Sequence, residues 1–113
     1  MYIKENGIYH SREIDNIILN KVSFYYDSTN VGHILYSECT LHGENVIYIE
    51  NITVQPEYRE QGFSESIIKD MCQLIVDTKV NIIYIRANNF VMTYLKKTID
   101  KYTKLAGIEV NYE

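Results

Sequence analysis

The sequence predicts an α/β fold with a mixed sheet: an antiparallel meander in the first half, then a strand–helix–strand–helix segment and a candidate last strand. Hydrophobic residues make up 46% of the 113 residues, with 11 Tyr but only 5 Gly and 1 Pro, and strands favour such a composition. Hydrophobic residues alternate along the first half, whereas they recur at helical spacing after Gly62. The length fits a single domain over residues 1–113, because two separate cores would each be too small to be stable.

The first half is predicted to consist of strands joined by polar turns. Alternation is clearest between residues 16 and 26, where Ile18, Val22, Phe24 and Tyr26 fall on one side. Turn-forming residues cluster on both sides of this segment and again further along the chain, at 11–15, 27–30 and 42–45. We therefore expect an antiparallel meander of strands over residues 3–10, 16–26, 31–41 and 46–54.

Hydrophobic spacing changes in the second half. Pro56 ends the meander, because proline cannot donate a hydrogen bond to a neighbouring strand. The apolar residues that follow at helical spacing are Phe63, Ile67, Met71, Leu74 and Ile75. They predict a first helix.

A second strand–helix unit follows. After an apolar strand over residues 81–87, Asn88 or Asn89 can cap a second helix. The apolar stripe of this helix is Val91, Tyr94, Leu95, Thr98, Ile99 and Tyr102. Residues 105–111 are the candidate last strand. Two strands joined through a helix are usually parallel neighbours with a right-handed connection, so we expect parallel pairing in this half of the sheet.

Charge and composition exclude several functional classes. The formal net charge of −4 disfavours a nucleic-acid binder, because binding phosphates needs a basic surface. No apolar run approaches the length of a membrane span, and the first residues lack the apolar core of a signal peptide. Neither the cysteines, Cys39 and Cys72, nor the histidines, His10, His33 and His42, have metal-ligand spacing. We expect no metal site, both cysteines in the core, and a reducing cytoplasmic location.

The segment most informative about function joins the meander to the first helix. Within residues 52–64 a strand ends, a loop follows, and a helix is expected to begin at about Phe63 or Ser64. The first backbone amides of a helix have no acceptor within the helix, and the positive end of the helix dipole adds to their attraction for anions. Gly62 has no Cβ, so a ligand can approach the backbone closely there. This arrangement predicts a site for a pyrophosphate group.

This segment resembles the phosphate-binding motif of the GNAT superfamily of N-acetyltransferases. The superfamily pattern is a strand, then Val-x-Pro-x-x-Arg-x-x-Gly-x-(Gly or Ala), then a helix. Residues 54–64 read VQPEYREQGFS between a predicted strand and a predicted helix, and the resemblance extends over about residues 31–102. It implies a GNAT-like fold and the use of acetyl-coenzyme A (acetyl-CoA) as cosubstrate.

The resemblance also implies roles for individual residues. The backbone of Ile52 and Val54 would pair with the pantetheine arm of the cofactor as an added strand does, and the amides of residues 61–65 would hold its pyrophosphate. Arg59 would hold the loop and the phosphates, and Tyr94 would lie near the thioester sulfur. The full set of implied cofactor-binding residues is Ile52, Thr53, Val54, Arg59, Gln61, Gly62, Phe63, Ser64, Glu65, and Asn88 or Asn89.

Some features depart from the superfamily pattern. Ser64 stands where Gly or Ala is favoured, although its hydroxyl group can cap the helix or bind a phosphate oxygen. Glu60 stands where Gly is frequent, and a carboxylate about 6–8 Å from a pyrophosphate would weaken binding by about 1 kcal/mol. Residues 10–16 leave almost no room for the two helices on the acceptor side of the superfamily fold. The chain therefore resembles a minimal, stand-alone member, and analogy does not assign its acceptor pocket.

Glu50 and Tyr94 are the candidate catalytic residues. An acceptor lysine with a pKa of about 10.4 must lose a proton, which costs about 4–5 kcal/mol at pH 7. Glu50 can accept that proton, since it alternates with Tyr48 and Ile52 on a strand expected to be central. The alternatives for Glu50 are a cross-strand ion pair and a sheet-edge position. The amide of Val54 would donate to the thioester carbonyl oxygen if the strand bulges there. Tyr94 is either the acid for the departing thiolate or a core aromatic residue of the second helix.

Together with the resemblance, these features predict an acetyl-CoA-dependent N-acetyltransferase. The acetyl group would move to a primary amine, on a protein lysine or a small molecule, by direct attack in a ternary complex. The alternative is a catalytically inactive interaction module that keeps the GNAT fold, with or without bound coenzyme A. The expected partner is an amine-bearing acceptor rather than nucleic acid or a membrane, and the tyrosine-rich faces are compatible with a homodimer.

Overall fold

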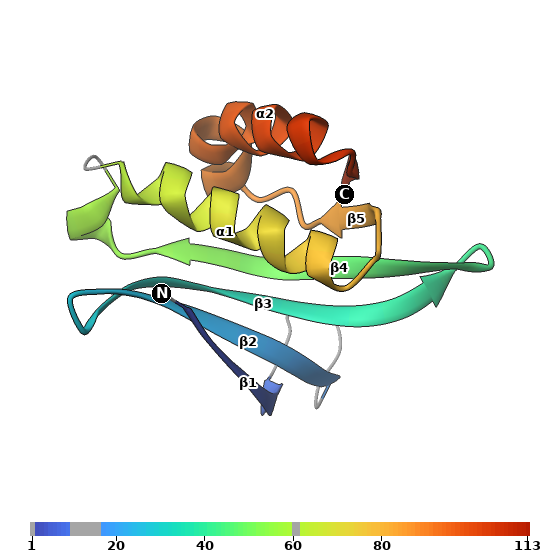
Figure 1. Ribbon diagram of the computed structural model, residues 1–113, viewed down its shortest axis with the longest axis horizontal. Coiled ribbons are helices and arrows are strands. Elements are labelled where there is room, and N and C mark those ends of the chain that lie inside the picture. Colours follow the sequence, from blue (N-terminus) through green and yellow to red (C-terminus); the bar gives the residue numbers. More distant parts are fainter. Residues whose placement is uncertain (1, 10–16, 60–61) are drawn as a thin grey trace.

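In the described part of the chain, the strands form one six-stranded sheet in the order β1-β2-β3-β4-β5-β6. This computed structural model describes the backbone of residues 2–9, 17–59 and 62–113, and the side chains of residues 19–59 and 62–113. Helices α1 and α2 lie together on one face of the sheet (Figure 1). The elements are β1 (Tyr2–Tyr9), β2 (Ile17–Tyr26), β3 (Thr29–Leu41), β4 (Glu44–Val54), the short helix η1 (Pro56–Tyr58), α1 (Phe63–Asp77), β5 (Ile82–Ile85), the π-helical turn η2 (Val91–Leu95), α2 (Lys96–Ala106) and β6 (Glu109–Tyr112).

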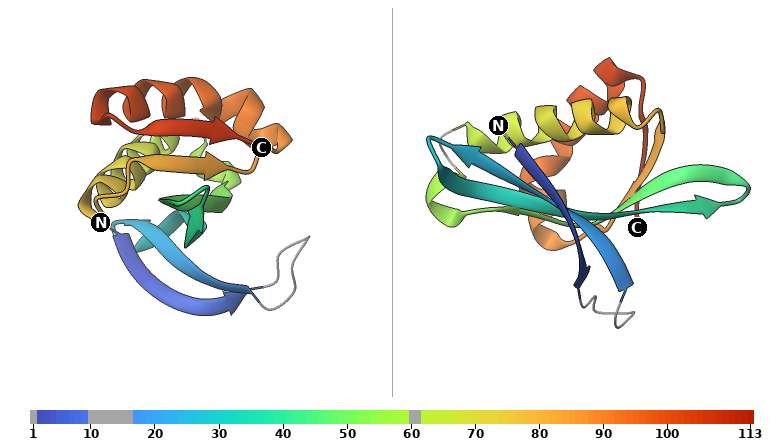
Figure 2. Two further views of the ribbon diagram at one scale, coloured as in Figure 1. Left: turned by 90° about the vertical axis from the view of Figure 1, so that its right-hand side faces the viewer. Right: turned by 60° about the horizontal axis from the view of Figure 1, so that its bottom comes forward.

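The sheet is antiparallel from β1 to β4 and parallel from β4 to β6. Each parallel pair is joined through a helix, and crossovers of one hand that step in the same direction place their helices on the same face. The sheet twists, so that β1 and β2 run at an angle to β4 (Figure 2). The predicted mixed sheet, with a meander followed by a strand–helix–strand–helix segment, is confirmed.

Two tight hairpins join β2 to β3 and β3 to β4. Their central residues have positive φ angles: 49° at Asp27, 65° at Ser28, 52° at His42 and 79° at Gly43. Two-residue turns with both central residues in the left-handed region match the twist of the flanking strands. The strands therefore extend further into the predicted turn segments than the sequence indicated.

The core lies between α1, α2 and the face of the sheet that they cover. The sheet contributes the buried side chains Val22, Phe24, Ile34, Tyr36, Ile47, Ile49, Ile52, Val54, Ile83 and Ile85. The helical segments contribute Ile67, Ile68, Met71, Cys72, Leu74, Ile75, Val91, Leu95 and Ile99. The core prediction is wrong for Cys39, which is exposed. Cys39 pairs with Val46 close to the β3–β4 turn, and the tip of this hairpin projects beyond the helices (Figure 1).

The second helix begins with a wider turn than the sequence indicated. Asn88 caps it, because the Val91 amide donates to Asn88 Oδ1 at 2.9 Å. The π-helical turn that follows adds a residue to the usual helical repeat, and Val91, Leu95, Ile99 and Thr103 are buried at intervals of four. Of the two alternatives considered for Tyr94, the core aromatic residue is therefore wrong, since its side chain is 69% exposed.

The last strand begins later than predicted. Leu105 and Ala106 are still helical, and the helix ends at Gly107, whose φ is 72°. The left-handed conformation of this glycine lets the Ile108 amide donate back to Thr103 O at 2.9 Å, which completes the helix end. The strand predicted over residues 105–111 is thus confined to residues 109–112, where it pairs with β5.

Three side chains fasten β6 to α2. The Tyr112 hydroxyl donates to Asp100 Oδ1 at 2.7 Å, and Lys96 Nζ donates to Asp100 Oδ2 at 2.8 Å. Burial acts to raise the pKa of Asp100, but the hydrogen bonds from Lys96 and Tyr112 and the lysine charge outweigh it and hold this pKa below its ordinary value. Burial, followed by the hydrogen bond to the Asp100 carboxylate, raises the pKa of Tyr112.

Because the pKa of Asp100 is lowered in the folded protein, its charged form stabilises the fold, and this contribution is lost as the pH falls. We expect the wild type to melt above the variant Asp100→Asn at about pH 5 and higher, and the difference to shrink below about pH 4. Thermal melting of both proteins across this range measures the effect. The variant Tyr112→Phe, which removes one donor, should retain part of the pH dependence, and a wild-type advantage that stays constant down to about pH 2.5 would contradict the assignment.

Gly32 lets β3, β4 and α1 approach closely. It is buried in β3 opposite Val54. A Cβ at this position would lie 2.3 Å from Thr53 O and 2.9 Å from Ile67 Cδ1. The first contact is with backbone, which cannot rotate aside as a side chain can, so the packing here requires glycine.

We expect the substitution Gly32→Ala to lower the free energy of unfolding by about 1–3 kcal/mol, because overpacking outweighs the smaller entropy loss of alanine on folding. Urea denaturation followed by circular dichroism measures the change. Cys39→Ala, at an exposed position of the same strand, is the matched control and should change stability by less than about 0.5 kcal/mol. Equal stabilities of the two variants would refute the close-packing argument.

Candidate functional site

β4 and β5 separate in the middle of the sheet. They pair only over Ile47–Ile49 and Ile83–Ile85, and the Arg86 amide adds one further bond to Ile49 O at 3.0 Å. Beyond that point β4 continues to Val54, and in the described part of the chain no strand pairs with it on the β5 side. The second half of β4 therefore has an open edge inside the sheet.

The backbone groups of Ile52 and Val54 face this open edge. The Gln55 amide donates to Val31 O at 2.9 Å, on the β3 side. Backbone groups point alternately to the two sides along a strand, so those of Val54 and Ile52 point the other way. An extended ligand can pair with them as an added strand would.

A bulge sets this orientation. β4 carries one extra residue, Glu50, between the residues that pair with Leu35 and Tyr36 of β3. An inserted residue reverses the alternation of the strand beyond it. The conditional prediction of a bulge at Val54 is wrong, because Val54 pairs in regular register with β3 and the bulge lies at Glu50.

Glu50 and Arg86 form an ion pair where the two strands part. Arg86 Nη1 lies 2.5 Å from Glu50 Oε1, and the two side chains are only 21% and 16% exposed, respectively. Arg86 directly follows β5, so the pair links the two strands at the end of their pairing. This contact is the ion-pair alternative considered for Glu50, and it holds the carboxylate in a fixed position.

α1 begins at Phe63, as predicted. Gly62 precedes it with a φ of 81° and provides no side-chain cap. The Ser66 amide donates to Gly62 O at 3.3 Å, so the amides of residues 63–65 are the ones that the helix geometry leaves without an intrahelical acceptor. The positive end of the helix dipole and these amides are suited to an anion.

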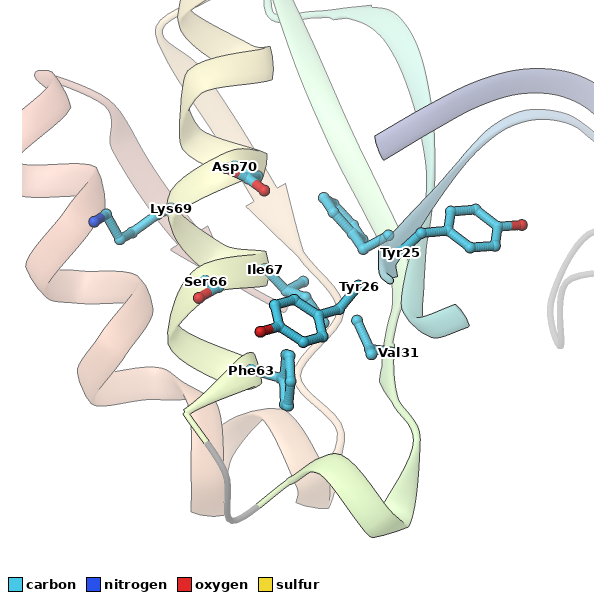
Figure 3. A pocket seen from close by; sticks show the side chains of 9 residues that line it. Tyr25, Tyr26, Val31, Phe63, Ser66, Ile67, Lys69 and Asp70 are labelled. Atoms are coloured by element: carbon cyan, nitrogen blue, oxygen red, sulfur yellow. The ribbon is translucent and has the colours of Figure 1, made fainter. Parts of the chain in front are cut away.

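The Phe63 ring packs away from the open edge, in a cluster with Tyr26 and Tyr58. Its centroid lies 5.2 Å from that of each tyrosine, in edge-on geometry. Tyr26 and Phe63 point toward one another at a cavity of about 320 Å³ between α1 and the β2–β3 hairpin, whereas the Tyr25 ring points away from it (Figure 3). Phe63 therefore presents only its amide to an anion, while its ring fixes where the helix begins.

The Glu65 side chain reaches α2. Its carboxylate accepts a hydrogen bond from the Tyr102 hydroxyl and lies 3.9 Å from Lys101 Nζ. The hydrogen bond to Glu65 raises the pKa of Tyr102. The first turn of α1 is thus tied to α2, and the carboxylate also suits the positive end of the helix dipole.

Arg59 lies across the open edge of β4. Its Nε donates to Val54 O at 2.9 Å, and its guanidinium carbon lies 4.4 Å from the centre of the Phe90 ring. The family resemblance implied that Arg59 holds the loop and the phosphates, but it assigned no role to Phe90. The only signal for Phe90 was an aromatic residue beside the cap of the second helix and outside its apolar stripe.

Arg59 and Phe90 line two cavities. The first, of about 340 Å³, lies toward the start of α1, and its other lining residues are Pro56, Ser64 and Tyr94. The second, of about 470 Å³, lies along the open edge and the loop after β5, and its other lining residues are Asn51, Ile52, Thr53, Asn88 and Asn89. We refer to them as the helix-side cavity and the strand-side cavity.

The structure brings only some of the predicted site residues to these cavities. The lining includes Ile52, Thr53, Arg59, Ser64, Asn88, Asn89 and Tyr94, but not Glu50, Val54, Gly62, Phe63 or Glu65. Tyr94 stands at the rim of the helix-side cavity, with its ring 5.7 Å from that of Phe90. Asn88 lines the strand-side cavity, but its side-chain oxygen already caps the second helix. Glu50 precedes Asn51, which lines that cavity. Gln61 lies outside the described residues, and so does Glu60, which departs from the superfamily pattern.

Metal-ligand clusters and membrane-spanning helices are both absent from the part of the chain that the structure describes. Among residues 19–59 and 62–113, no group of three or more His, Cys, Asp and Glu side chains gathers as metal ligands would. No described helix has the length and apolarity needed to cross a membrane.

The sequence matches a protein family and a curated protein. A family model described as "Acetyltransferase (GNAT) family" matches residues 5–105. The thialysine N-epsilon-acetyltransferase of Bos taurus is 36% identical over 79 residues, which is 68% of this chain and 44% of that protein. The chain therefore spans less than half the length of this curated relative.

Solved structures share the fold. An aminoglycoside acetyltransferase from an uncultured soil metagenomic sample superposes with a TM-score of 0.56 at 19% identity, covering 77% of this chain and 57% of that one. An aminoglycoside N-acetyltransferase in complex with CoA superposes with a TM-score of 0.52 at 17% identity, covering 80% of this chain and 68% of that one. At these identities the likeness establishes the fold alone.

Proposed function

The chain belongs to the acetyltransferase (GNAT) family, and from this premise we propose that residues 1–113 form one catalytic domain that transfers an acetyl group from acetyl-CoA to a primary amine. One observation supports the proposal above others. The open edge of β4 ends at Val54, and after a short loop the chain enters α1 through Gly62, with its φ of 81°. An extended arm with a pyrophosphate at one end fits such an edge followed by such a helix start.

The chain offers different groups to the two parts of the cofactor. The backbone of Ile52 and Val54 pairs with the pantetheine arm, next to Thr53 in the strand-side cavity. The amides of residues 63–65 hold the pyrophosphate, and Ser64 adds a hydroxyl donor from the helix-side cavity. When bound, acetyl-CoA supplies an activated acetyl thioester. The solved aminoglycoside N-acetyltransferase in complex with CoA supports this choice of cosubstrate, since it has the same fold.

Glu50 acts as the base. The acceptor amine must be neutral before it attacks the thioester carbonyl carbon, and removing the proton from a lysine-like amine costs about 4–5 kcal/mol at pH 7. Glu50 stands at the bulge where β4 leaves β5, and the ion pair with Arg86 fixes its carboxylate in place. A fixed carboxylate can take up the amine proton directly or through a water molecule.

Tyr94 acts as the acid. Cleavage of the carbon–sulfur bond leaves a thiolate, which needs a proton. The Tyr94 side chain is 69% exposed, and its ring lies 5.7 Å from that of Phe90, which also lines the strand-side cavity, so its hydroxyl group is available to donate that proton. The amine attacks directly, with cofactor and acceptor bound at the same time.

The acceptor is an amine-bearing molecule. The names of similar proteins, a thialysine acetyltransferase and an aminoglycoside acetyltransferase, support cationic amines as the first candidates. The net charge of −4 also favours the approach of cationic acceptors. Thialysine, lysine and an aminoglycoside are therefore the compounds to test first.

One observation favours the alternative of an inactive interaction module. The carbonyl oxygen of Val54, which the pantetheine arm would use, already accepts a hydrogen bond from Arg59. If this contact were permanent, the open edge would stay closed to a cofactor. Binding and turnover measurements separate the two functions.

The proposed function is tested by mixing the purified chain with acetyl-CoA and each candidate amine, and by measuring the released thiol and the acetylated product. Calorimetric titration with CoA measures binding independently. Binding with turnover supports the transferase. Binding without turnover on any amine would favour the interaction module, and absence of binding would overturn both the cofactor assignment and the activity.

We expect the substitution Glu50→Gln to lower kcat by about 10²–10⁴-fold, because the amide cannot take up the amine proton. The CoA dissociation constant should stay unchanged, since the cofactor contacts are assigned to other residues. Glu38→Gln makes the same chemical change at an exposed position of β3 and is the matched control. A Glu50→Gln enzyme that retains full kcat at saturating amine would remove Glu50 from the mechanism.

A further inference from the structure

Arg59 and Phe90 form the boundary between the helix-side cavity and the strand-side cavity. Each of the two residues lines both cavities. They come from opposite sides of the gap between β4 and β5, since Arg59 follows β4 and Phe90 follows β5. The guanidinium carbon of Arg59 lies 4.4 Å from the centre of the Phe90 ring, a distance at which a cation is attracted to an aromatic face. The contact therefore bridges the gap between the strands.

The same arginine covers part of the open edge. Its Nε donates to Val54 O at 2.9 Å, and Val54 O faces the side of β4 on which an added strand would pair. A ligand that pairs with this carbonyl must take the place of Arg59. The Val54 carbonyl oxygen is thus already occupied by the protein's own Arg59 side chain, which also lines the strand-side cavity.

We propose that Arg59 and Phe90 form a gate which the cofactor opens on binding, an inference that rests on the proposed use of acetyl-CoA. In the closed state Arg59 lies between Val54 O and the Phe90 ring. In the open state it leaves both partners, and its guanidinium group contacts the phosphates at the start of α1. Pairing of the pantetheine arm with β4 and binding of the phosphates by Arg59 therefore occur together.

The closed and open positions proposed for the Arg59 side chain are close to one another. Ser64, in the first turn of α1, lines the helix-side cavity together with Arg59. The Arg59 side chain is exposed in the closed state, so no packed core has to rearrange when it turns. A guanidinium group binds phosphate through paired, charge-assisted hydrogen bonds, which are stronger than its bond to a neutral carbonyl. The phosphates can therefore draw Arg59 away from Val54.

Phe90 is the fixed half of the gate. It precedes the π-helical turn η2, and its neighbour Val91 is buried and bonded to the cap residue Asn88. The Phe90 ring is also supported by Tyr94, with their centroids 5.7 Å apart. Opening therefore moves the arginine rather than the ring.

The variant Arg59→Met tests the gate with two ligands. Pantetheine has no phosphate, so for this ligand the wild-type arginine is only an obstacle, and the variant should bind it about two- to five-fold more tightly. CoA carries the phosphates, and loss of their charge-assisted bonds should weaken its binding by about ten-fold or more. Ligand-detected NMR with pantetheine and calorimetry with CoA measure the two dissociation constants. Opposite signs for the two ligands are the expected result.

The variant Phe90→Leu tests the part that Phe90 plays in the gate. It keeps an apolar side chain but removes the aromatic face, so Arg59 is held less firmly. We expect CoA to associate about two- to five-fold faster in stopped-flow measurements. Met92→Leu is the matched control, because Met92 is exposed two positions further along and lines neither cavity. It should leave the association rate unchanged. Thermal melting verifies that each variant is folded.

The outcomes separate the gate from the proposed function. If the wild-type chain does not bind CoA, the cofactor assignment fails and the gate fails with it. If the wild type binds CoA but Arg59→Met weakens pantetheine and CoA alike, Arg59 is an ordinary binding residue and the gate is overturned. An association rate in Phe90→Leu equal to that of the wild type would equally overturn it.

Discussion

The separation of β4 from β5 after Ile49 is the constraint on which the site depends. Backbone amides and carbonyls need hydrogen-bond partners when they are buried, and an unpaired edge normally lies at the margin of a sheet, where it is open to strand addition. Here the bulge at Glu50 turns the backbone of Ile52 and Val54 toward a gap in the middle of the sheet. The helix start, Arg59 and the second helix are arranged around that gap.

The part of the site that acts through local backbone geometry was predictable from the sequence. A strand, a proline, a glycine and a helical stripe follow one another between residues 52 and 75, and each acts on its neighbours in the chain. The contact between Arg59 and Phe90 was not predictable, because it joins distant segments and depends on how the strands diverge. The bulge also depends on register with β3, and its only local sign was a charged residue, Glu50, in an apolar strand.

The fold was predictable to a similar extent. Alternation and helical spacing identified the elements in their correct order, and errors arose where several backbone states fit one pattern. An apolar stripe does not distinguish an α-helical turn from a π-helical one, so Tyr94 was placed in the stripe of the second helix although its side chain is exposed. The start of the last strand was predicted too early for the same reason. Leu105 and Ala106 suit a strand as well as a helix, and α2 continues through both residues to its end at Gly107.

The contact of the Phe63 ring with Tyr26 and Tyr58 has a consequence for where α1 begins. Tyr26 belongs to the β2–β3 hairpin, while the Phe63 amide opens α1. The anion-attracting end of the helix is thereby held by a hairpin far away in the sequence as well as by the loop that precedes it. Residues that touch neither cavity therefore help to set the position of the amides that the site depends on.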